Sequence, residues 1–239
     1  MNTIIKTSLG AILLLVISCK KQSTLKYSQI TDKSSTPDVI TGINDLGINS
    51  FIKIGTQKWM TKNLAVSRYR NGDKIPQVTD PAAWAALTTG AWCWYNNDSA
   101  IGAVYGRLYN WYAVHDPRGL APIGWHVPSD LEWDTLSTFL GNNAGGKLKD
   151  TGTIEAGTGL WYAPNAGATN KTGFTGLPGG YRGGHSGAFD DFGGEGYWWT
   201  STHYNASKAR DRNLHYLDGH VGTYQYDKRY GFSVRCLRD

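Results

Sequence analysis

Glycine is concentrated in the middle of this 239-residue chain, and that concentration limits what the middle can form. Residues 141–196 contain 17 of the chain's 30 glycines, together with Pro164 and Pro178. Both residue types destabilise the interior of helices and strands, so the pattern predicts long ordered loops rather than sheet or helix. No GxxxxGK[ST] run and no strand–GxGxxG–helix unit occurs, which argues against a phosphate-binding loop.

The sequence has start signals for two helices, one at residues 80–81 and one at residues 129–132. Asp80 before Pro81 is an N-cap followed by proline at the first helical position. Ser129 and Glu132 have the spacing of a capping box, which predicts a helix over about 129–140. The apolar positions of this helix fall on one face at Trp133, Leu136 and Leu140.

The C-terminal part has the alternation of an antiparallel β-meander. We expect strands at 197–202, 212–217 and 221–226, and a closing strand that begins at Phe232. Asp218-Gly219 is a type I′ hairpin signal between the second and third of these strands. Together with the two helices, these strands predict an α+β fold with many loops.

The N-terminus has the pattern of an export signal, which we place at residues 1–18. Leu9–Ile17 is apolar but too short to span a bilayer. It ends in VISC, which resembles the bacterial lipoprotein cleavage box and implies that Cys19 carries the lipid; the alternative is an ordinary secretory signal. We expect a lipidated Cys and polar tether over 19–46, and a single domain over 47–239. The expected location is the bacterial cell envelope, at the outer membrane, with the periplasmic or surface side left open.

Two cysteines remain after Cys19, and the net charge of +5 comes from the N-terminal region. Cys93 and Cys236 form an even pair in an exported protein, which favours a disulfide over two buried free thiols. Ten Lys and Arg but three acidic residues precede residue 71. Because no basic stripe with interleaved aromatic residues is present, nucleic acid is not an expected partner.

Residues 203–230 have an unusual composition, since 13 of the 28 positions are Asn, Asp, His or Tyr. The segment lacks Trp and Phe, although the rest of the chain is rich in Trp. Antibody-like paratopes use such mixtures: Tyr supplies rigid amphipathic area, and small polar residues supply adaptable hydrogen bonds. The composition therefore predicts a binding surface.

Several segments together resemble the Fibrobacter succinogenes major paralogous domain family. They are QKWMTKNL (57–64), YGRLYNWYAV (105–114), GWHVPSDLEWDTL (124–136), GFTGLPGGYRG (173–183), GYWWTST (196–202) and GFSVRCLRD (231–239). The resemblance covers nearly the whole expected domain in the right order. It implies a C-type-lectin-like fold of the formylglycine-generating-enzyme type: two helices, a small twisted antiparallel sheet and long loops.

The segment between the last two motifs also resembles the variable region of proteins diversified by retroelements. In such systems template adenines mutate, so Asn codons yield Asp, His or Tyr by first-base change. Only Lys208, Gln225 and Lys228 cannot arise from such codons here. Strand alternation predicts that Asp211 and Asn213 face solvent while Leu214 packs. The alternative is a Tyr- and Asn-rich strand pair with no such history.

These observations predict a lipid-anchored protein that binds an external protein or glycan through its C-terminal face, without catalysis. The expected contact residues are His203, Tyr204, Asn205, Asp211, Asn213, His215, Asp218, His220, Tyr224, Tyr226, Asp227 and Tyr230. The alternative is a fixed carbohydrate-binding or adhesion module that stacks sugars on Trp161, Trp198 or Trp199.

Catalytic and metal sites have weaker signals. The functional cysteine pair of formylglycine-generating enzymes has no counterpart, because the expected domain offers only Cys93 and Cys236. No HExxH, HxH or cysteine cluster occurs, so no cofactor is expected. Asp190, Asp191 and Glu195 are candidate Ca²⁺ ligands, the favoured alternative being a solvated acidic loop. His126 is expected to be a buried structural residue.

Overall fold

The computed structural model describes residues 50–239, and over this range the chain has the α+β class expected from the sequence. The helices are α1 (Pro81–Ala85), α2 (Ser99–Tyr105), α3 (Trp111–Val114), α4 (Asp130–Leu140) and α5 (Ala144–Leu148), with a 3-10 turn at Tyr95–Asn97. The strands are β1 (Phe51–Ile54), β2 (Gln57–Met60), β3 (Trp92–Cys93), β4 (Leu108–Tyr109), β5 (Trp125–His126), β6 (Gly179–Arg182), β7 (Phe189–Phe192), β8 (Glu195–His203), β9 (Lys208–His215), β10 (Gly222–Asp227) and β11 (Leu237–Arg238).

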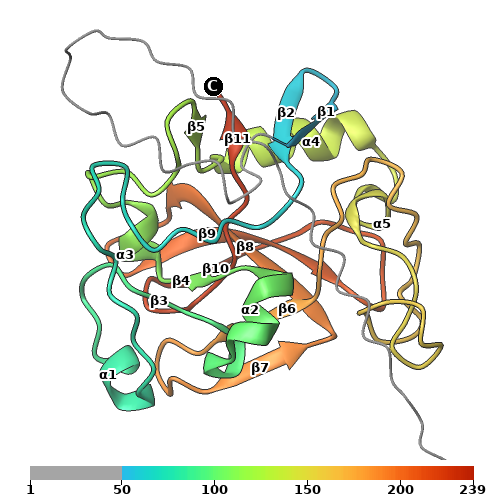
Figure 1. Ribbon diagram of the computed structural model, residues 1–239. Helices are drawn as coiled ribbons and strands as arrows, with labels where there is room; N and C mark the ends of the chain where they lie inside the picture. The colour runs from blue at the N-terminus through green and yellow to red at the C-terminus, as the bar shows by residue number, and fades with distance from the viewer. Residues whose placement is uncertain (1–49) are drawn as a thin grey trace, which may run out of the picture. The chain divides into compact units, whose positions relative to one another are not determined.

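The strands form one five-stranded sheet and two smaller ones. The large sheet has the order β10-β9-β8-β6-β7, and it is antiparallel except where β6 runs beside β8. A second sheet has the order β1-β2-β11-β5, so the last strand pairs with the second. In Figure 1, α4, β1 and β2 lie on one side of β8 and β9, whereas α1, α2, β6 and β7 lie on the other.

Strand β8 carries the core of the fold on both of its faces. Tyr197 and Trp199 belong to one apolar cluster, with Phe232 and Trp111. Trp198, which points the opposite way, belongs to a second cluster with residues of α4 and β2. Both faces of this part of the sheet are therefore covered, as the apolar run YWW indicates.

Helix α4 begins and ends where the sequence predicts. The Ser129 hydroxyl accepts a hydrogen bond from the Glu132 amide, and the Glu132 carboxylate accepts one from the Ser129 amide. The capping box is therefore confirmed, as is the Asp80 cap of α1, whose carboxylate accepts from the Ala83 amide. Trp133 and Leu136 are buried against the second cluster.

Replacing Ser129 with Ala should lower the free energy of unfolding by about 1 kcal/mol, because the first turn of α4 loses its side-chain acceptor. Urea unfolding followed by far-UV circular dichroism measures the change. Thr138→Ala, at an exposed position in the same helix, is the matched control and should change stability by less than about 0.5 kcal/mol. Equal losses in both variants would show that the cap contributes nothing.

The glycine-rich stretch contains regular structure that the sequence does not predict. Within 141–196 the structure forms α5, β6 and β7, so the prediction of loops alone is wrong. Close packing explains α5: a Cβ added at Gly145 would lie 2.0 Å from the His220 carbonyl oxygen, and one at Gly146 would lie 2.1 Å from that of Gly167. Glycine allows this helix to approach neighbouring backbone, a tertiary requirement that outweighs its poor helix propensity.

The connection between β9 and β10 is longer than the sequence predicts. It spans residues 216–221 rather than a two-residue turn at Asp218-Gly219. The buried ammonium of Lys149 donates to the carbonyl oxygens of Ala166, His215 and Asp218 at 2.8–2.9 Å. The amide of Gly145 donates to the carbonyl oxygen of Gly219 in the same loop. Because residues far away in the sequence hold the loop, its backbone conformation cannot be predicted from its own turn residues.

Cys93 and Cys236 are free and buried, so the predicted disulfide is wrong. Cys93 packs in a small cluster with Trp84 and Leu108, whereas Cys236 packs with the cluster of Trp111 and Phe232. Burial raises the pKa of the Cys93 thiol to about 12 and also raises that of Cys236. Neither thiol has the thiolate character of a nucleophile.

Polar side chains from the two ends of the described range, residues 50–239, meet at its middle. The Asn63 side-chain oxygen accepts from the Trp198 indole at 2.9 Å and from the Arg235 guanidinium at 2.7 Å. Arg235 also donates to the carbonyl oxygen of Phe174, and its guanidinium lies 4.1 Å from the centre of that ring. These groups join the segment after β2, strand β8 and the closing segment, and the bonds from Arg235 are charge-assisted.

The expected signal segment, Cys19 and the tether over 19–46 lie outside the described residues. Within residues 50–239, none of the helices has the length and apolar character needed to cross a membrane.

A tyrosine–carboxylate site on the large sheet

The residues expected to bind ligand lie in three places rather than on one surface. His203, Tyr204 and Asn205 lie at the β8–β9 turn, and Asp218 and His220 lie in the loop at the other end of β9. Since β9 has eight residues, these two groups are separated by about 25 Å. The remaining expected residues lie along β9 and β10, apart from Tyr230, which follows β10.

The β8–β9 turn is exposed, and its shape depends on residues that the sequence treats as variable. The Asn205 side-chain oxygen accepts from the amides of Ser207 and Lys208, at 2.9 and 2.8 Å. Lys228, from beyond β10, donates its ammonium to the Ala206 carbonyl oxygen. Tyr204 is 48% exposed, so its ring is open to a partner.

In the loop over 216–221, as in the β8–β9 turn, a residue expected to bind ligand instead holds the backbone in shape. The Asp218 carboxylate accepts from the His220 amide at 2.8 Å and so forms a local turn. The side chain of His220 is exposed. Asp227, the last residue of β10, is paired with Arg229 at 2.8 Å. Asn205, Asp218 and Asp227 therefore each have a structural role.

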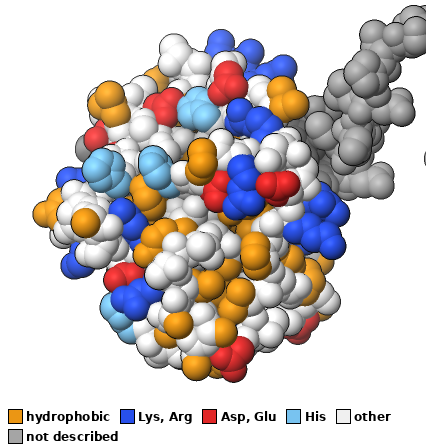
Figure 2. Space-filling model, turned by 90° about the vertical axis from the view of Figure 1, so that its left-hand side faces the viewer, with side chains coloured by type: hydrophobic (Ala, Val, Ile, Leu, Met, Phe, Trp, Pro, Cys, Tyr) orange, Lys and Arg blue, Asp and Glu red, His pale blue; other side chains and the backbone are white. Residues whose placement is uncertain are grey.

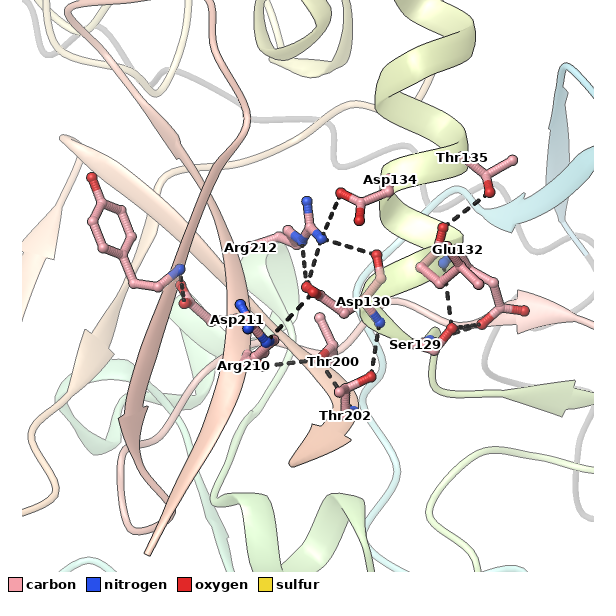
Figure 3. A network of polar contacts seen from close by, with 12 residues as sticks. Ser129, Asp130, Glu132, Asp134, Thr135, Thr200, Thr202, Arg210, Asp211 and Arg212 are labelled. Carbon is pink, nitrogen blue, oxygen red and sulfur yellow. Dashed lines mark hydrogen bonds and ion pairs between the residues drawn. The ribbon is translucent and has the colours of Figure 1, made fainter. Parts of the chain in front are cut away.

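Asp211 and Asn213 do not face solvent, so that expectation is wrong. Asp211 is 0% exposed and Asn213 is 7% exposed. They share one face of β9, as predicted, and Arg212 points to the other face, where it contacts Asp130 at 2.6 Å and Asp134 at 2.9 Å. Figure 3 shows Arg212 reaching α4 while Asp211 turns away from it. Both faces of β9 are covered, so alternation could not distinguish inside from outside.

Tyrosine rings cover the Asp211 face of the sheet. Strand register places Tyr224 opposite Asp211 and Tyr226 opposite Ala209. The Tyr226 ring centroid lies 5.1 Å from that of Tyr230 and 6.1 Å from that of Tyr197. Tyr181 of β6 lies 5.4 Å from Tyr197 by the same measure. Tyr224 is 55% exposed, so the cluster opens to solvent at the edge strand β10.

Carboxylates line the same face. The Tyr197 hydroxyl donates to Asp191 at 2.7 Å, and the Asn213 amide donates to Glu195 at 2.7 Å. His215 Nε2 lies 3.6 Å from the other oxygen of Glu195. We call this arrangement the tyrosine–carboxylate site; it consists of Tyr181, Tyr197, Tyr224, Tyr226, Tyr230, Asp191, Glu195 and Asp211.

Asp211 is the unusual member of this site. Its Oδ1 accepts from the Tyr224 amide at 3.0 Å, but its buried Oδ2 has no hydrogen-bond partner among residues 50–239. Burial, reinforced by the charge of Glu195, raises the pKa of Asp211 to about 7. Burial also raises the pKa of Tyr197, aided by its hydrogen bond to Asp191, and that of Tyr226. Tyr197 and Tyr226 are therefore neutral donors, and Asp211 changes charge near neutral pH.

Other expected residues have different surroundings. Within residues 50–239 no group of three His, Cys, Asp or Glu is arranged to hold a metal ion, and Asp191 is taken by Tyr197. His126 is half-buried rather than buried, with Glu132 at 2.8 Å and Asp239 at 2.6 Å. The three tryptophans proposed as sugar platforms are at most 1% exposed; they are Trp161, Trp198 and Trp199.

The sequence alone did not predict Tyr181 and Tyr197 as site residues. It indicated Asp191 and Glu195 only as candidate Ca²⁺ ligands or as part of a solvated acidic loop. Their signal is present as the run of acids and aromatics between Tyr181 and Trp199. The chain fold brings this run beside β9 and β10, which the linear sequence does not show.

Comparison with models of known protein families identifies the family of this domain. The model of the Fibrobacter succinogenes major domain matches residues 52–238. The chain belongs to this family. No curated protein and no solved structure gives a match.

The motifs that mark this chain as a Fibrobacter succinogenes major domain are largely structural. Asn63, Trp198 and Arg235, from three of them, form the buried network described above. Asn110 caps α3 by accepting from the Ala113 amide, and the Trp111 indole donates to the Thr200 carbonyl oxygen. The motifs thus build the core on which the tyrosine–carboxylate site is mounted.

The surface of this Fibrobacter succinogenes major domain mixes charges of both signs. On the face shown in Figure 2, Lys and Arg side chains lie among Asp and Glu in the upper half, and hydrophobic side chains are scattered below. On this face the basic side chains are interrupted by other side chains rather than gathered into one continuous patch.

Proposed function

We propose that this protein is an exported, lipid-anchored binding protein of the bacterial envelope. Its tyrosine–carboxylate site would bind an external protein or glycan without catalysis. The observation that carries the proposal is Asp211: a buried carboxylate with an unpaired oxygen, under tyrosines that open to solvent at β10. Anchoring rests on the VISC sequence that ends in Cys19.

The chemistry of the site supports binding rather than catalysis. Tyrosine offers large rigid contact area with a polar tip, which suits a recognition surface. The buried cysteines have raised pKa values, so they are poor nucleophiles. We infer in addition a C-type-lectin-like fold, supported by long loops, the helix α4 and the pairing of β11 with β2 near the start of the domain.

Retroelement diversification is part of the proposal, and the structure narrows where it would act. The exposed positions His203, Tyr204, His220 and Tyr224 could change without loss of a buried contact. Asp211 and Asn213 are buried, so side chains of a different size or shape would disturb the sheet at these positions. A near-copy of the gene's 3′ end with adenine-rich codons at the four exposed positions, beside a reverse transcriptase, would support diversification; sequencing that finds neither would refute it.

The carbohydrate-binding alternative needs other stacking residues, because Trp161, Trp198 and Trp199 are buried. The exposed aromatic residues of this region are Tyr204 and Tyr224, which belong to the expected binding segment. A glycan is therefore retained as one class of ligand for the same face.

The proposal predicts that ligand binding depends on Tyr224. The full chain would be screened on defined protein and glycan arrays, and the affinity for each ligand measured with purified components. Tyr224→Ala should weaken binding by about tenfold or more, since an exposed aromatic residue at the centre of an interface contributes about 2 kcal/mol. Phe139→Ala is the control, because Phe139 is 64% exposed on α4.

Two results would contradict the proposal. One is the absence of any ligand on the arrays. The other is a ligand whose affinity falls equally in the Tyr224 and Phe139 variants, since α4 packs on the opposite face of β8 and β9.

A further inference from the structure

The tyrosine–carboxylate site has more negative charge than neighbouring cations balance. Asp191 and Glu195 contact a hydroxyl, an amide and His215, rather than Lys or Arg. The cations of adjacent strands are engaged elsewhere. Arg212 pairs with α4, and Arg182 donates to the carbonyl oxygens of Val78, Thr79 and Gly187.

Cations near the ends of the site are also engaged. Lys149 donates to the carbonyl oxygens of Ala166, His215 and Asp218, and Arg229 pairs with Asp227, the last residue of β10. His185 lies 3.9 Å from Asp227, with its ring 6.2 Å from that of Tyr230. Among residues 50–239 no Lys or Arg forms an ion pair with Asp191, Glu195 or Asp211, and the charge of Arg212 acts on Asp211 only from the opposite face of β9.

We propose that the tyrosine–carboxylate site takes a cationic group of the external ligand, an alkylammonium or a guanidinium. This inference rests on the proposed function and names the chemistry of its ligand. Ring faces of Tyr226 and Tyr230 attract cations through their quadrupoles, and Glu195, together with Asp211 in its ionised form, supplies opposite charge. The unpaired Oδ2 of Asp211 is the acceptor that the cation would satisfy.

Access to Asp211 is controlled by Tyr224. Tyr224 lies directly opposite Asp211 in the strand register and is 55% exposed. Exposed side chains change rotamer within nanoseconds, so this ring can turn aside without disturbing the sheet. An organic cation fits better than a metal ion, since the described residues offer no cluster of metal ligands and the rings supply π faces.

The test uses n-butylammonium as the probe and n-butanol as its uncharged analogue, added to the full chain with ¹³C-labelled tyrosine rings. Butylammonium should shift resonances of the site's tyrosines in a saturable manner, and butanol should not. Asp211→Asn should raise the Kd by about tenfold or more, and Glu195→Gln by about threefold. Asp73→Asn, at an exposed carboxylate in the loop before α1, is the control and should leave the Kd unchanged.

A lysine-containing peptide identifies the source of the cation. Tighter binding of Gly-Gly-Lys-Gly-Gly than of butylammonium, lost on Nε-acetylation, would indicate a protein ligand; equal binding would indicate a small amine. Both results support a cation site. Equal shifts with butanol, or unchanged Kd values in both the Asp211 and Glu195 variants, would overturn it.

The outcomes separate this inference from the proposed function. If an array ligand depends on Tyr224 but neither competes with butylammonium nor responds to Asp211→Asn, the cation inference fails and the binding function stands. If butylammonium binds through Asp211 but no array ligand depends on Tyr224, the cation site stands and the proposed function fails. Circular dichroism spectra would verify that each variant is folded.

Discussion

Replacing Asp211 with Asn should stabilise the protein at pH 8 and leave its stability near pH 4 almost unchanged. Burial raises the pKa of Asp211 to about 7 from an ordinary value of 3.8. Between these two values the unfolded chain has lost the proton while the folded protein keeps it. The unfolded state then binds fewer protons, so the wild-type free energy of unfolding falls as the pH rises from about 4 to 7.

The size of the effect follows from the width of that window. One pKa unit corresponds to about 1.4 kcal/mol, so a window of about three units gives a loss on the order of 4 kcal/mol by pH 8. Asn keeps the oxygen that accepts from the Tyr224 amide and carries no charge at any pH. Urea unfolding at several pH values between 4 and 8 should show a falling curve for the wild type and a flatter one for the variant.

The matched control is Asp73→Asn, because Asp73 is exposed and cannot impose a burial penalty. It should retain the wild-type fall between pH 4 and 7. If Asp211→Asn also retains the full fall, Asp211 is ionised in the folded protein across this range, and its burial does not set its charge.

Replacing Arg235 with Met should destabilise the protein by about 3 kcal/mol or more. Met preserves much of the side-chain length but removes every donor. The carbonyl oxygen of Phe174 and part of the Asn63 side chain would lose their partner in a buried position. Each unsatisfied buried polar group costs about 1–3 kcal/mol. The opposing term is the desolvated charge itself, since burial lowers the pKa of Arg235 to about 9.

Arg238→Met provides the comparison, because Arg238 lies three residues later and is exposed. Its guanidinium lies over the Phe51 ring at 5.0 Å, a contact worth about 0.5–1 kcal/mol at an exposed site. Chemical unfolding of both variants at one pH gives the difference. Similar losses would mean that the Asn63–Arg235 network is not a principal source of stability.

The parts of the fold that follow from local chemistry could be predicted. Helix α4 was predictable because Ser129 and Glu132 satisfy its first turn without help from the rest of the chain. Helix α5 was not, since its glycines are explained by the backbone of His220 and Gly167 lying against them. The position of the β9–β10 loop likewise depends on Lys149, far away in sequence.

The candidate site, too, could be predicted only as far as local sequence patterns determine it. Alternation placed Asp211 and Asn213 on one face of β9 and Leu214 on the other. It could not show that tyrosines from β6, β8 and β10 cover the first face, because those strands meet only in the folded sheet. Composition identified the tyrosines of β10 as recognition residues; whether they bind ligand stays a prediction.

Two lysines have a consequence for how this surface can change over time. Lys149 holds the β9–β10 loop and Lys228 holds the β8–β9 turn, and both bind main-chain carbonyl oxygens. Every residue type supplies such an oxygen, so these contacts do not depend on which side chains the loop and the turn carry. Mutations at Tyr204 or His220 can therefore accumulate while the backbone keeps its course. If this surface binds ligand as proposed, the domain can acquire new specificities without first acquiring new stability.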